Sequence, residues 1–387
     1  MLISGAGIAG LAVSRPLAHA GHRVVAIDKA RQFDSRGHGI TIKGTGVQVL
    51  KKFGLYEALS AQRFRFERIR GYDRSGNCLR EYRTVEAEEK LGGYVMTRRA
   101  DLHQVLLNAL PKSVELRFDT EIAGVQQNTT GVNVSFSRGP PETFDLVLGC
   151  DGVHSSLRHK ALPEVAEAPL GGHYVAFVVD FEHGLESLVA HAVFGLGRNI
   201  NVLPVDRDRV GVLIYQDDRW REPPTSNAGR GWREYFLGDG SDLPDFVSRV
   251  LGAIPDDLYV FADRIIMIPA KRIVDGRIAF LGDAGYCPTF LSGMGAAAAL
   301  QGAYCLAAQI DRHADLPEAL RRYEEKILPI AMAYQKSALL MRGLLLTRSP
   351  LKRWLLDNAL RFVSTGQLSK RAQHFYHSEV DLDELGS

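Results

Sequence analysis

Short apolar runs alternate with longer amphipathic segments along the first part of the chain. Residues 1–4 are mostly apolar, residues 11–18 place apolar side chains at helical spacing, and residues 23–27 are mostly apolar again. This order predicts a strand, a helix and a second, parallel strand, which together form the βαβ unit of an α/β fold. Pro16 falls inside the predicted helix, where it either kinks the helix or occupies a position at which a hydrogen bond can be spared.

Strand patterns dominate the middle of the chain, and helical patterns dominate its end. Long runs rich in β-branched and aromatic residues lie between residues 170 and 265, which predicts an antiparallel sheet with flanking helices. From residue 317 onward, apolar side chains recur at three- and four-residue spacing, as in amphipathic helices. The predicted strands are residues 174–179, 188–194, 200–205 and 209–215, and the flanking helices lie near 232–236 and 243–251.

A glycine-rich turn joins the first predicted strand to the first predicted helix. Gly5, Gly7 and Gly10 form a GxGxxG motif, and Asp28 ends the second strand. In this setting the first glycine permits a tight turn, the second lets the backbone approach a pyrophosphate, and the third lets helix and strand pack closely. The helix N-terminus offers N–H groups to phosphates, and the acidic side chain can hold a ribose. The motif predicts dinucleotide binding but does not separate NAD from FAD.

A second strand–loop–helix segment surrounds Asp283. Residues 277–281 have the pattern of a buried strand, and Gly293 to Gly295 precede an alanine-rich helix. A carboxylate at a strand end can accept a hydrogen bond from a ribityl hydroxyl, and a helix N-terminus can stabilise negative charge on a flavin pyrimidine. Alone, the segment is better explained as an ordinary structural unit. Together with the first motif, it indicates one large cofactor held at two ends.

A third motif lies between these two segments. An apolar strand ends at Asp151 and Gly152, and Ser155 and Arg158 follow at fixed offsets. With these three ordered motifs, the chain resembles the class A flavoprotein monooxygenases, the family of p-hydroxybenzoate hydroxylase and the tetracycline-inactivating hydroxylases. A weaker element is Arg99, which resembles the family's arginine at the start of a helix that reaches the flavin phosphate or ribityl chain.

The resemblance covers residues 1 to about 310 and implies an α/β fold. We expect a Rossmann-like FAD-binding domain interleaved with an antiparallel-sheet substrate domain, followed by C-terminal helices. The expected FAD-binding domain comprises residues 1–70, 97–165 and 266–312, the substrate domain comprises 71–96 and 166–265, and the C-terminal helical segment is 313–387.

The resemblance also implies a reaction. FAD is the expected cofactor, and NAD(P)H is expected as a transient co-substrate without a second Rossmann domain. Reduced flavin would react with O2 to a C4a-hydroperoxide that hydroxylates an aromatic or polyketide-like small molecule, as in secondary metabolism. The flavin provides the chemistry, so no catalytic side chain is predicted. The predicted cofactor-binding residues are Gly5, Ala6, Gly7, Ile8, Ala9, Gly10, Asp28, Lys29, Arg36, Arg99, Asp151, Asp283, Gly293, Met294, Gly295 and Ala296.

Two positions depart from the family pattern. Asp28 and Lys29 stand where relatives often have Glu-Arg, which shortens the reach to the ribose but keeps the charge. Phe290 stands where many relatives have a proline beside the isoalloxazine, although Pro288 is close by in the loop. The second departure affects the expected oxygenation chemistry more than it affects FAD binding.

The predicted substrate pocket lies between the middle sheet and the cofactor. Candidate residues near strand centres are His191, Asn201 and Tyr215, although such residues more often have structural roles. Phe290 and Leu291 are stronger candidates for apolar walls, because the loop that follows Asp283 places them beside the flavin. Strand alternation alone does not decide which set of side chains faces the pocket.

Composition excludes several other classes of protein. The 387 residues have a net charge of +2, which gives no strong field for nucleic acid or an anionic membrane. Four cysteines without metal-type spacing indicate free thiols and a cytoplasmic protein, and no metal site is predicted. We expect no cleavable leader and no stable membrane insertion. The basic C-terminal helices either pack along the domain interface or bind a membrane surface or partner, and the first interpretation is preferred.

Two alternative functions remain open at this stage. A flavin-dependent dehydrogenase or oxidative-rearrangement enzyme could use the same scaffold, and Phe290 favours this alternative. A non-catalytic dinucleotide-binding protein would keep both cofactor motifs without turnover. The WxWxIP signature of flavin halogenases and the GxSxG elbow of serine hydrolases are both absent from the sequence.

Overall fold

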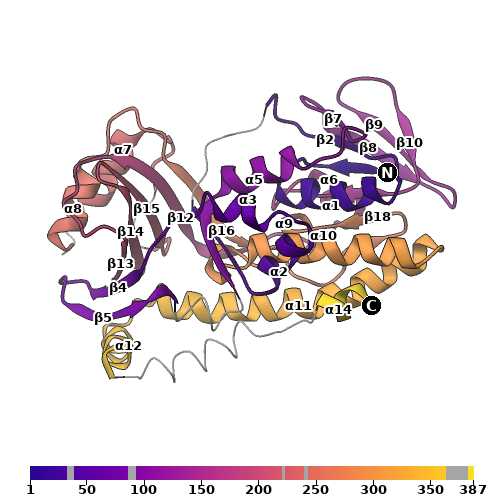
Figure 1. Cartoon of the computed structure of the whole chain (residues 1–387). Coiled ribbons are helices and arrows are strands. Elements are labelled where there is room, and N and C mark those ends of the chain that lie inside the picture. Colours follow the sequence, from indigo (N-terminus) through magenta and orange to yellow (C-terminus); the bar gives the residue numbers. More distant parts are fainter. Residues whose placement is uncertain (33–38, 86–92, 220–222, 239–242, 363–381) are drawn as a thin grey trace.

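A computed structural model describes residues 1–32, 39–85, 93–219, 223–238, 243–362 and 382–387 (Figure 1). Within these residues, one mostly parallel sheet has the strand order β17-β18-β11-β1-β2-β7. Four of its strands are only three residues long and are buried along their whole length, as expected for a parallel sheet covered on both faces. The strands are β1 (Leu2–Ser4), β2 (Val25–Ile27), β7 (Glu115–Arg117), β11 (Val147–Gly149), β17 (Val274–Asp275) and β18 (Ile278–Phe280).

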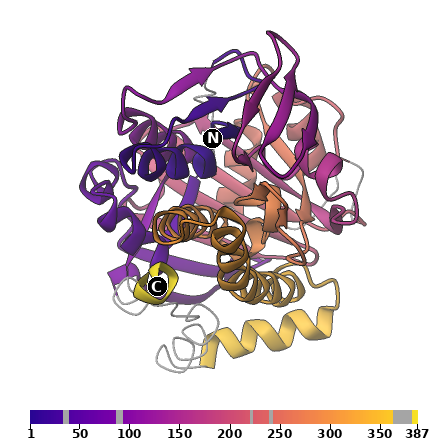
Figure 2. The ribbon, with the colours of Figure 1, turned by 90° about the vertical axis from the view of Figure 1, so that its right-hand side faces the viewer.

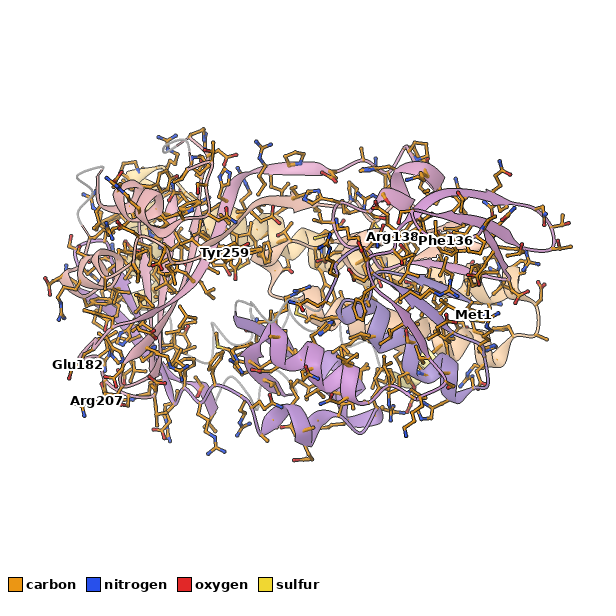
Figure 3. The ribbon with its side chains drawn as sticks, turned by 90° about the horizontal axis from the view of Figure 1, so that it is seen from above. Met1, Phe136, Arg138, Glu182, Arg207 and Tyr259 are labelled. Carbon is orange, nitrogen blue, oxygen red and sulfur yellow. The ribbon has the colours of Figure 1, made fainter. Side chains whose placement is uncertain are left out.

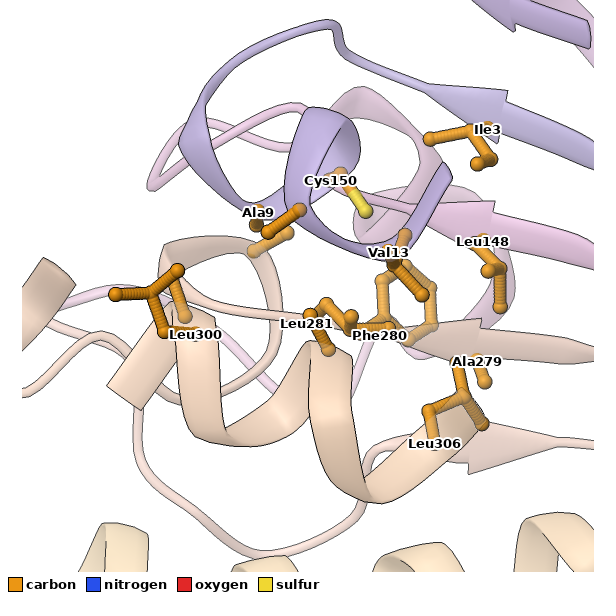
Figure 4. Close-up of a cluster of buried hydrophobic side chains, with 14 of the residues drawn as sticks. Ile3, Ala9, Val13, Leu148, Cys150, Ala279, Phe280, Leu281, Leu300 and Leu306 are labelled. Carbon is orange, nitrogen blue, oxygen red and sulfur yellow. The ribbon is translucent and has the colours of Figure 1, made fainter. Parts of the chain in front are cut away.

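Long helices pack against this sheet and form the larger core of the protein. Helix α1 (Ile8–His19) contacts both α5 (Arg99–Asn108) and α10 (Gly295–Arg312). Figure 4 shows Ala9 and Val13 of α1 close to Phe280 and Leu281, next to Leu300 of α10. Helix α11 (Leu316–Leu345) lies beside α10 (Figure 2). Pro16 lies near the C-terminal end of α1, and that helix continues to His19.

Smaller elements complete this part of the molecule. Strands β3 (Gly39–Lys43) and β6 (Tyr94–Arg98) pair antiparallel, and α2 (Thr45–Lys52) packs against α10. A separate sheet has the order β10-β9-β8. Its strands are β8 (Ile122–Gln127), β9 (Val132–Phe136) and β10 (Glu142–Phe144), and the remaining short helices are α3 (Tyr56–Ser60), α6 (Ser156–Ala161), α9 (Asp283–Tyr286) and η1 (Phe290–Ser292).

A second large sheet has the strand order β16-β12-β15-β14-β13-β4-β5 in the described residues. All its pairs are antiparallel except β4 with β13, which are parallel. The predicted strands between residues 174 and 215 pair antiparallel, as expected, and the one parallel pair of the described sheet arises where β4, from the N-terminal part of the chain, joins β13. The strands are β4 (Arg68–Asp73), β5 (Cys78–Arg83), β12 (Ala168–Asp180), β13 (Val189–Phe194), β14 (Arg198–Asp206), β15 (Arg209–Gln216) and β16 (Phe261–Met267).

The two faces of the second sheet differ. Helices α7 (Gly229–Leu237) and α8 (Asp245–Gly252) cover one face, which we call the α8 face, and Val175, Val212 and Trp232 are buried there. We call the other face the Tyr174 face, because Tyr174 alternates with Val175 along β12. Figure 3 shows Glu182 and Arg207 at the end of the molecule opposite Met1 and Phe136.

The described residues of the C-terminal part form helices, as predicted. After α11, helix α12 (Pro350–Phe362) contacts β5, and the short α14 (Leu382–Gly386) contacts α2 and α10. No helix of the described residues is long and apolar enough to cross a bilayer. Two predicted domain limits, 70/71 and 96/97, fall inside β4 and β6, so these limits need to move to strand ends. The division into domains otherwise stays a prediction.

Candidate cofactor-binding and active site

Three loops meet at the carboxyl edge of the parallel sheet. β1 is followed by Gly5, β11 by Cys150 and β18 by Leu281. The parallel neighbours of β1 are β2 on one side and β11 on the other, so the direction in which strands are added reverses beside β1. Ligands of open α/β sheets bind outside the carboxyl ends of the strands at this kind of switch point. The first and third sequence motifs therefore lie where a ligand is expected.

The three motif glycines have different surroundings. Gly5 has a φ of +103°, and a Cβ there would lie 2.4 Å from the Cys150 carbonyl oxygen. A Cβ at Gly10 would lie 1.9 Å from the carbonyl oxygen of Gly5. A Cβ at Gly7 would meet no described atom within 4 Å, although Gly7 is the N-cap of α1. Gly5 and Gly10 thus permit close packing, whereas Gly7 leaves open space before a helix N-terminus, where a phosphate can approach.

Asp28 is tied to the glycine-rich turn. Its Oδ2 accepts a 2.9 Å hydrogen bond from the Ala6 N–H, and its Oδ1 accepts one of 2.9 Å from the Ala30 N–H. The carboxylate therefore fixes the turn, and its predicted contact with a ribose stays a prediction. Lys29 is exposed, Ile8 is half-buried, and Ala9 is buried beside Gly282. Arg36 lies outside the described residues.

His103, which the sequence analysis did not single out, contacts the glycine-rich turn. One of its ring nitrogens lies 2.9 Å from the carbonyl oxygen of Ala6, so α5 is joined to the glycine-rich turn. Burial lowers the pKa of His103, and the nearby Arg99 guanidinium lowers it further. His103 follows Arg99 by one helical turn, and this spacing is the signal that could have identified it.

The Asp283 side chain lies beside the N-terminus of α10. Its side chain is exposed to solvent, yet desolvation by the surrounding protein raises its pKa, while a hydrogen bond with Cys287 and the charge of Arg99 oppose the rise. A Cβ at Gly295 would lie 3.9 Å from Asp283 Oδ1, so the carboxylate faces the N-terminus of α10.

The loop before α10 brings the other predicted residues of the second motif together. Gly293 has a φ of +62°, and Met294 is buried in the core, so Met294 offers only backbone groups to a ligand. Gly295 and Ala296 are half-buried at the start of α10. Lys43 of β3 reaches the same loop, because its Nζ would lie 3.2 Å from a Cβ at Gly293. Lys43 was not predicted, and its strand was not recognised from the sequence.

The Asp-Gly motif that begins at Asp151 and Gly152 is joined by a hydrogen bond to the loop that contains Asp283. Arg158 is fully buried, and its guanidinium donates hydrogen bonds to the carbonyls of Val153, Val165 and Ala284. Ser155 caps α6 by accepting a hydrogen bond from the Arg158 N–H. Burial raises the pKa of Asp151, and its Oδ1 is buried without a hydrogen-bond partner among the described residues. A ligand hydroxyl would satisfy this oxygen.

Together, these residues fit a flavin dinucleotide. An open helix N-terminus follows Gly7 at one end and Gly295 at the other, and these N-termini favour the phosphates and the reduced pyrimidine, respectively. The exposed carboxylate of Asp283 and the unpartnered oxygen of Asp151 belong to two loops that the hydrogen bond from Arg158 to Ala284 holds together. This donor and acceptor set matches a ligand that has both anionic groups and hydroxyls.

An aromatic cluster lies beside the second motif. The ring of Phe290 stacks on Tyr174 with centroids 4.1 Å apart and an interplanar angle of 11°. Tyr215 is 5.4 Å and Phe261 is 6.1 Å from the same ring. The structure thus brings together the predicted residues Phe290 and Tyr215 through Tyr174, which was not singled out. Leu291 is buried with Ile265, Ala338 and Leu346, so it packs between the loop, β16 and α11.

The substrate-pocket prediction for His191 is corrected by the strand register. His191 lies 3.0 Å from the Tyr72 hydroxyl and packs on Phe246 of α8, so its side chain is on the α8 face. Asn201 alternates with Ile200 and Val202 of the α8 face and therefore lies on the Tyr174 face. Its Nδ2 donates to Asn199 Oδ1 at 2.9 Å. Asn201 and Tyr215 thus share a face that His191 does not.

Comparison with known proteins agrees with this geometry. The family described as "FAD binding domain" matches residues 1–227. A "Flavin-dependent monooxygenase" of Legionella longbeachae is 30% identical over 348 residues, which is 87% of this chain and 87% of that protein. The chain belongs to the FAD-dependent monooxygenase family. FAD is therefore its cofactor, and the sequence-based predictions of family, fold and cofactor are confirmed.

Solved structures of this monooxygenase fold cover nearly the whole chain. Tetracycline destructase Tet(51) has a TM-score of 0.76 at 25% identity, with 96% of this chain and 96% of that chain covered. HpxO of Klebsiella pneumoniae, solved with FAD and uric acid, has a TM-score of 0.83 at 21% identity, with 97% of this chain and 96% of that chain covered. The assignment of individual residues to FAD or substrate stays a prediction.

Proposed function

We propose that this monooxygenase uses NAD(P)H and O2 to hydroxylate an aromatic or polyketide-like small molecule. The observation that supports this most strongly is the stack of Phe290 on Tyr174. Seven positions separate Phe290 from Asp283, so one short segment joins the expected ribityl contact to the aromatic face of the second sheet. A planar substrate on the Tyr174 face would therefore lie next to the flavin end of the cofactor.

The residues that would hold FAD follow from the geometry. The N-terminus of α1 beyond Gly7 would bind the pyrophosphate, and the N-terminus of α10 at Gly295 and Ala296 would face the pyrimidine edge. Asp283 would accept hydrogen bonds from the ribityl chain, and Arg99 would lie near the same chain. When bound, FAD supplies the redox and oxygen-activating chemistry that no side chain of the chain can provide.

The protein's own contribution is orientation and exclusion of water. The half-buried rings of Tyr215, Phe261 and Phe290, which surround the buried Tyr174, form an apolar wall that can orient a planar ring and keep water away from it. NAD(P)H would act as a transient co-substrate, since the sequence has one GxGxxG motif in a strand–helix setting. We place the enzyme in the cytoplasm, because all four cysteines are free thiols.

Two proteins of similar structure suggest where a substrate search should begin. The HpxO structure contains uric acid, and Tet(51) is a tetracycline destructase. We therefore suggest planar heterocycles and fused polycyclic phenols as the first compounds to be tested. A non-catalytic dinucleotide-binding role is a weaker hypothesis, because binding of a dinucleotide alone does not account for the aromatic cluster beside the second motif.

The test is a substrate-stimulated oxidation assay. FAD-loaded protein is mixed with NADH or NADPH and a panel of phenolic and polycyclic compounds, and cofactor oxidation, hydrogen peroxide and product mass are measured. We expect at least one compound to accelerate NAD(P)H oxidation and to gain one oxygen atom. No acceleration across the panel with either nicotinamide cofactor would contradict the proposal.

One alternative keeps the flavin but changes the chemistry. Phe290 replaces the usual proline and stacks on Tyr174, so the wall beside the cofactor differs from the family pattern. A dehydrogenase or oxidative-rearrangement enzyme would convert its substrate without inserting oxygen. Product formation without oxygen from O2 would favour this alternative over hydroxylation.

A further inference from the structure

Asp263 shares the Tyr174 face with the aromatic cluster. In the ladder between β12 and β16, Asp263 lies directly opposite Tyr174, and Phe261 lies opposite Ala176. Directly opposed residues of an antiparallel pair point to the same face, with Cβ atoms about 5 Å apart. Ala262, the residue between Phe261 and Asp263, packs against the core of the α8 face. Alternation along β16 thus places Asp263 beside Tyr174 and Phe261.

Few groups of the described residues offset the negative charge of the Asp263 carboxylate. Its side chain is half-buried, and its Oδ1 accepts a 2.7 Å hydrogen bond from the neighbouring Arg264 N–H. No ion pair to Asp263 is seen within the described part of the chain. A half-buried carboxylate without a cation is stabilised when a ligand supplies a positive charge or a strong hydrogen-bond donor.

Asp263 also lies close to the cofactor loop. Burial is the main cause of the raised pKa values of Asp283 and Cys287, and the negative charge of Asp263 adds to both shifts. Cys287 precedes Phe290 by three positions, and Phe290 stacks on Tyr174. Asp263 is therefore at the junction between the second cofactor motif and the aromatic wall.

The aromatic neighbours favour the same kind of ligand. Tyr215, Phe261 and Phe290 are half-buried rings around Tyr174, so each keeps part of its surface accessible. Aromatic rings bind planar ring systems by stacking and attract cations over their faces. Rings beside a carboxylate without a described cation suit a ligand that combines an aromatic system with a positive charge.

We propose that Asp263 is a specificity-determining residue that selects aromatic substrates bearing a protonated amine. The amine would pair with the Asp263 carboxylate while the aromatic ring lies against the wall formed by Tyr215, Phe261 and Phe290. This assignment rests on the proposed function, because it places the substrate on the Tyr174 face next to the cofactor. It adds a chemical class that neither fold nor family membership specifies.

The test compares two matched probes by their binding to FAD-loaded protein without NAD(P)H. Tyramine carries a protonated amine, and para-ethylphenol has a similar phenolic frame without it. Binding is followed by perturbation of the visible flavin absorbance. We expect tyramine to bind about tenfold more tightly than para-ethylphenol, because one charge-assisted hydrogen bond accounts for a difference in affinity of about this size. Equal affinity, or no perturbation by either probe up to about 1 mM, would overturn the proposal.

Two variants test whether the preference for tyramine depends on Asp263. Asp263→Asn should lose most of the tyramine preference and keep its affinity for para-ethylphenol, with unchanged FAD content. Asp180→Asn makes the same charge change at an exposed position at the end of β12 and should behave like the parent. An unchanged preference in Asp263→Asn, or loss of FAD from that variant, would refute a substrate-recognition role. These binding results are separate from the turnover assay, so failure of the amine preference leaves the hydroxylation proposal standing.

Discussion

The Arg158 guanidinium donates a 2.8 Å hydrogen bond to the carbonyl oxygen of Ala284, a residue 126 positions further along the chain. Arg158 belongs to the Asp-Gly motif, and Ala284 immediately follows Asp283. The two motifs are therefore parts of one buried structure. Because Arg158 is wholly buried and also bonds the carbonyls of Val153 and Val165, it fixes the backbone on which the Asp283 carboxylate is held.

Replacing Arg158 should lower both stability and FAD affinity. Arg158→Ala leaves three carbonyls without their donor, and one unsatisfied buried acceptor typically costs about 1–3 kcal/mol. We expect a decrease of about 3 kcal/mol or more in the free energy of unfolding, measured by urea denaturation of the FAD-free protein. Arg272→Ala, which removes a half-exposed arginine, is the matched control and should change stability little. Equal stability of the two variants would contradict the buried connection.

Gly7 and Gly10 should respond differently to the same substitution. In Gly10→Ala the new Cβ would lie 1.9 Å from a backbone oxygen, so the backbone must move and the protein should be destabilised by at least about 1–3 kcal/mol. In Gly7→Ala the methyl group enters open space, so stability should be kept while FAD affinity falls. Thermal denaturation and FAD titration of both variants separate these effects. A large loss of stability in Gly7→Ala would argue against the open space before α1.

Asp283 should show a trade-off between apoprotein stability and cofactor binding. Its pKa is raised by burial, so the folded protein binds more protons than the unfolded chain at pH values between 3.8 and the raised pKa. Stability of the FAD-free protein should therefore decrease as pH rises through this window. Asp283→Asn should remove this pH dependence and lower FAD affinity by about tenfold or more, because it loses a charged acceptor. Full FAD retention in this variant would contradict the assignment.

His191 should affect acid stability without taking part in the reaction. Burial lowers its pKa from 6.5 to about 4, so protonation favours the unfolded chain as pH falls. The stability contribution of neutral His191 is present above about pH 6.5 and is lost as pH falls toward about 4. His191→Asn, which can still bond to Tyr72, should flatten this part of the stability curve measured by denaturation. A change in substrate affinity in this variant would indicate that His191 contacts the substrate after all.

Much of the fold and part of the site could be predicted from the sequence. The first βαβ unit and the α10 region have local signals, because apolar periodicity and glycine spacing directly reflect backbone requirements. Contacts between distant segments have no such signal. The stack of Phe290 on Tyr174 depends on how β12 lies against the loop after Asp283, and the His103 contact depends on the position of α5 beside the glycine-rich turn.

The sequence also did not determine on which face of the sheet the His191 side chain lies. Alternation along β13 divides its side chains into two sets, but the choice of set depends on which face α8 covers. Asp263 was missed because β16 has no clear alternating pattern and its partner strand is far away in sequence. The parallel pairing of β4 with β13 likewise depends on tertiary contacts.

The most direct test of the central claim is to follow labelled oxygen from O2 into a product. FAD-loaded protein is supplied with NAD(P)H, isotopically labelled O2 and the compound that most stimulates NAD(P)H oxidation, and the product is examined by mass spectrometry. We expect one labelled oxygen atom in each hydroxylated product molecule. NAD(P)H consumption that yields only hydrogen peroxide or an unlabelled product, for every compound of the panel, would contradict the claim.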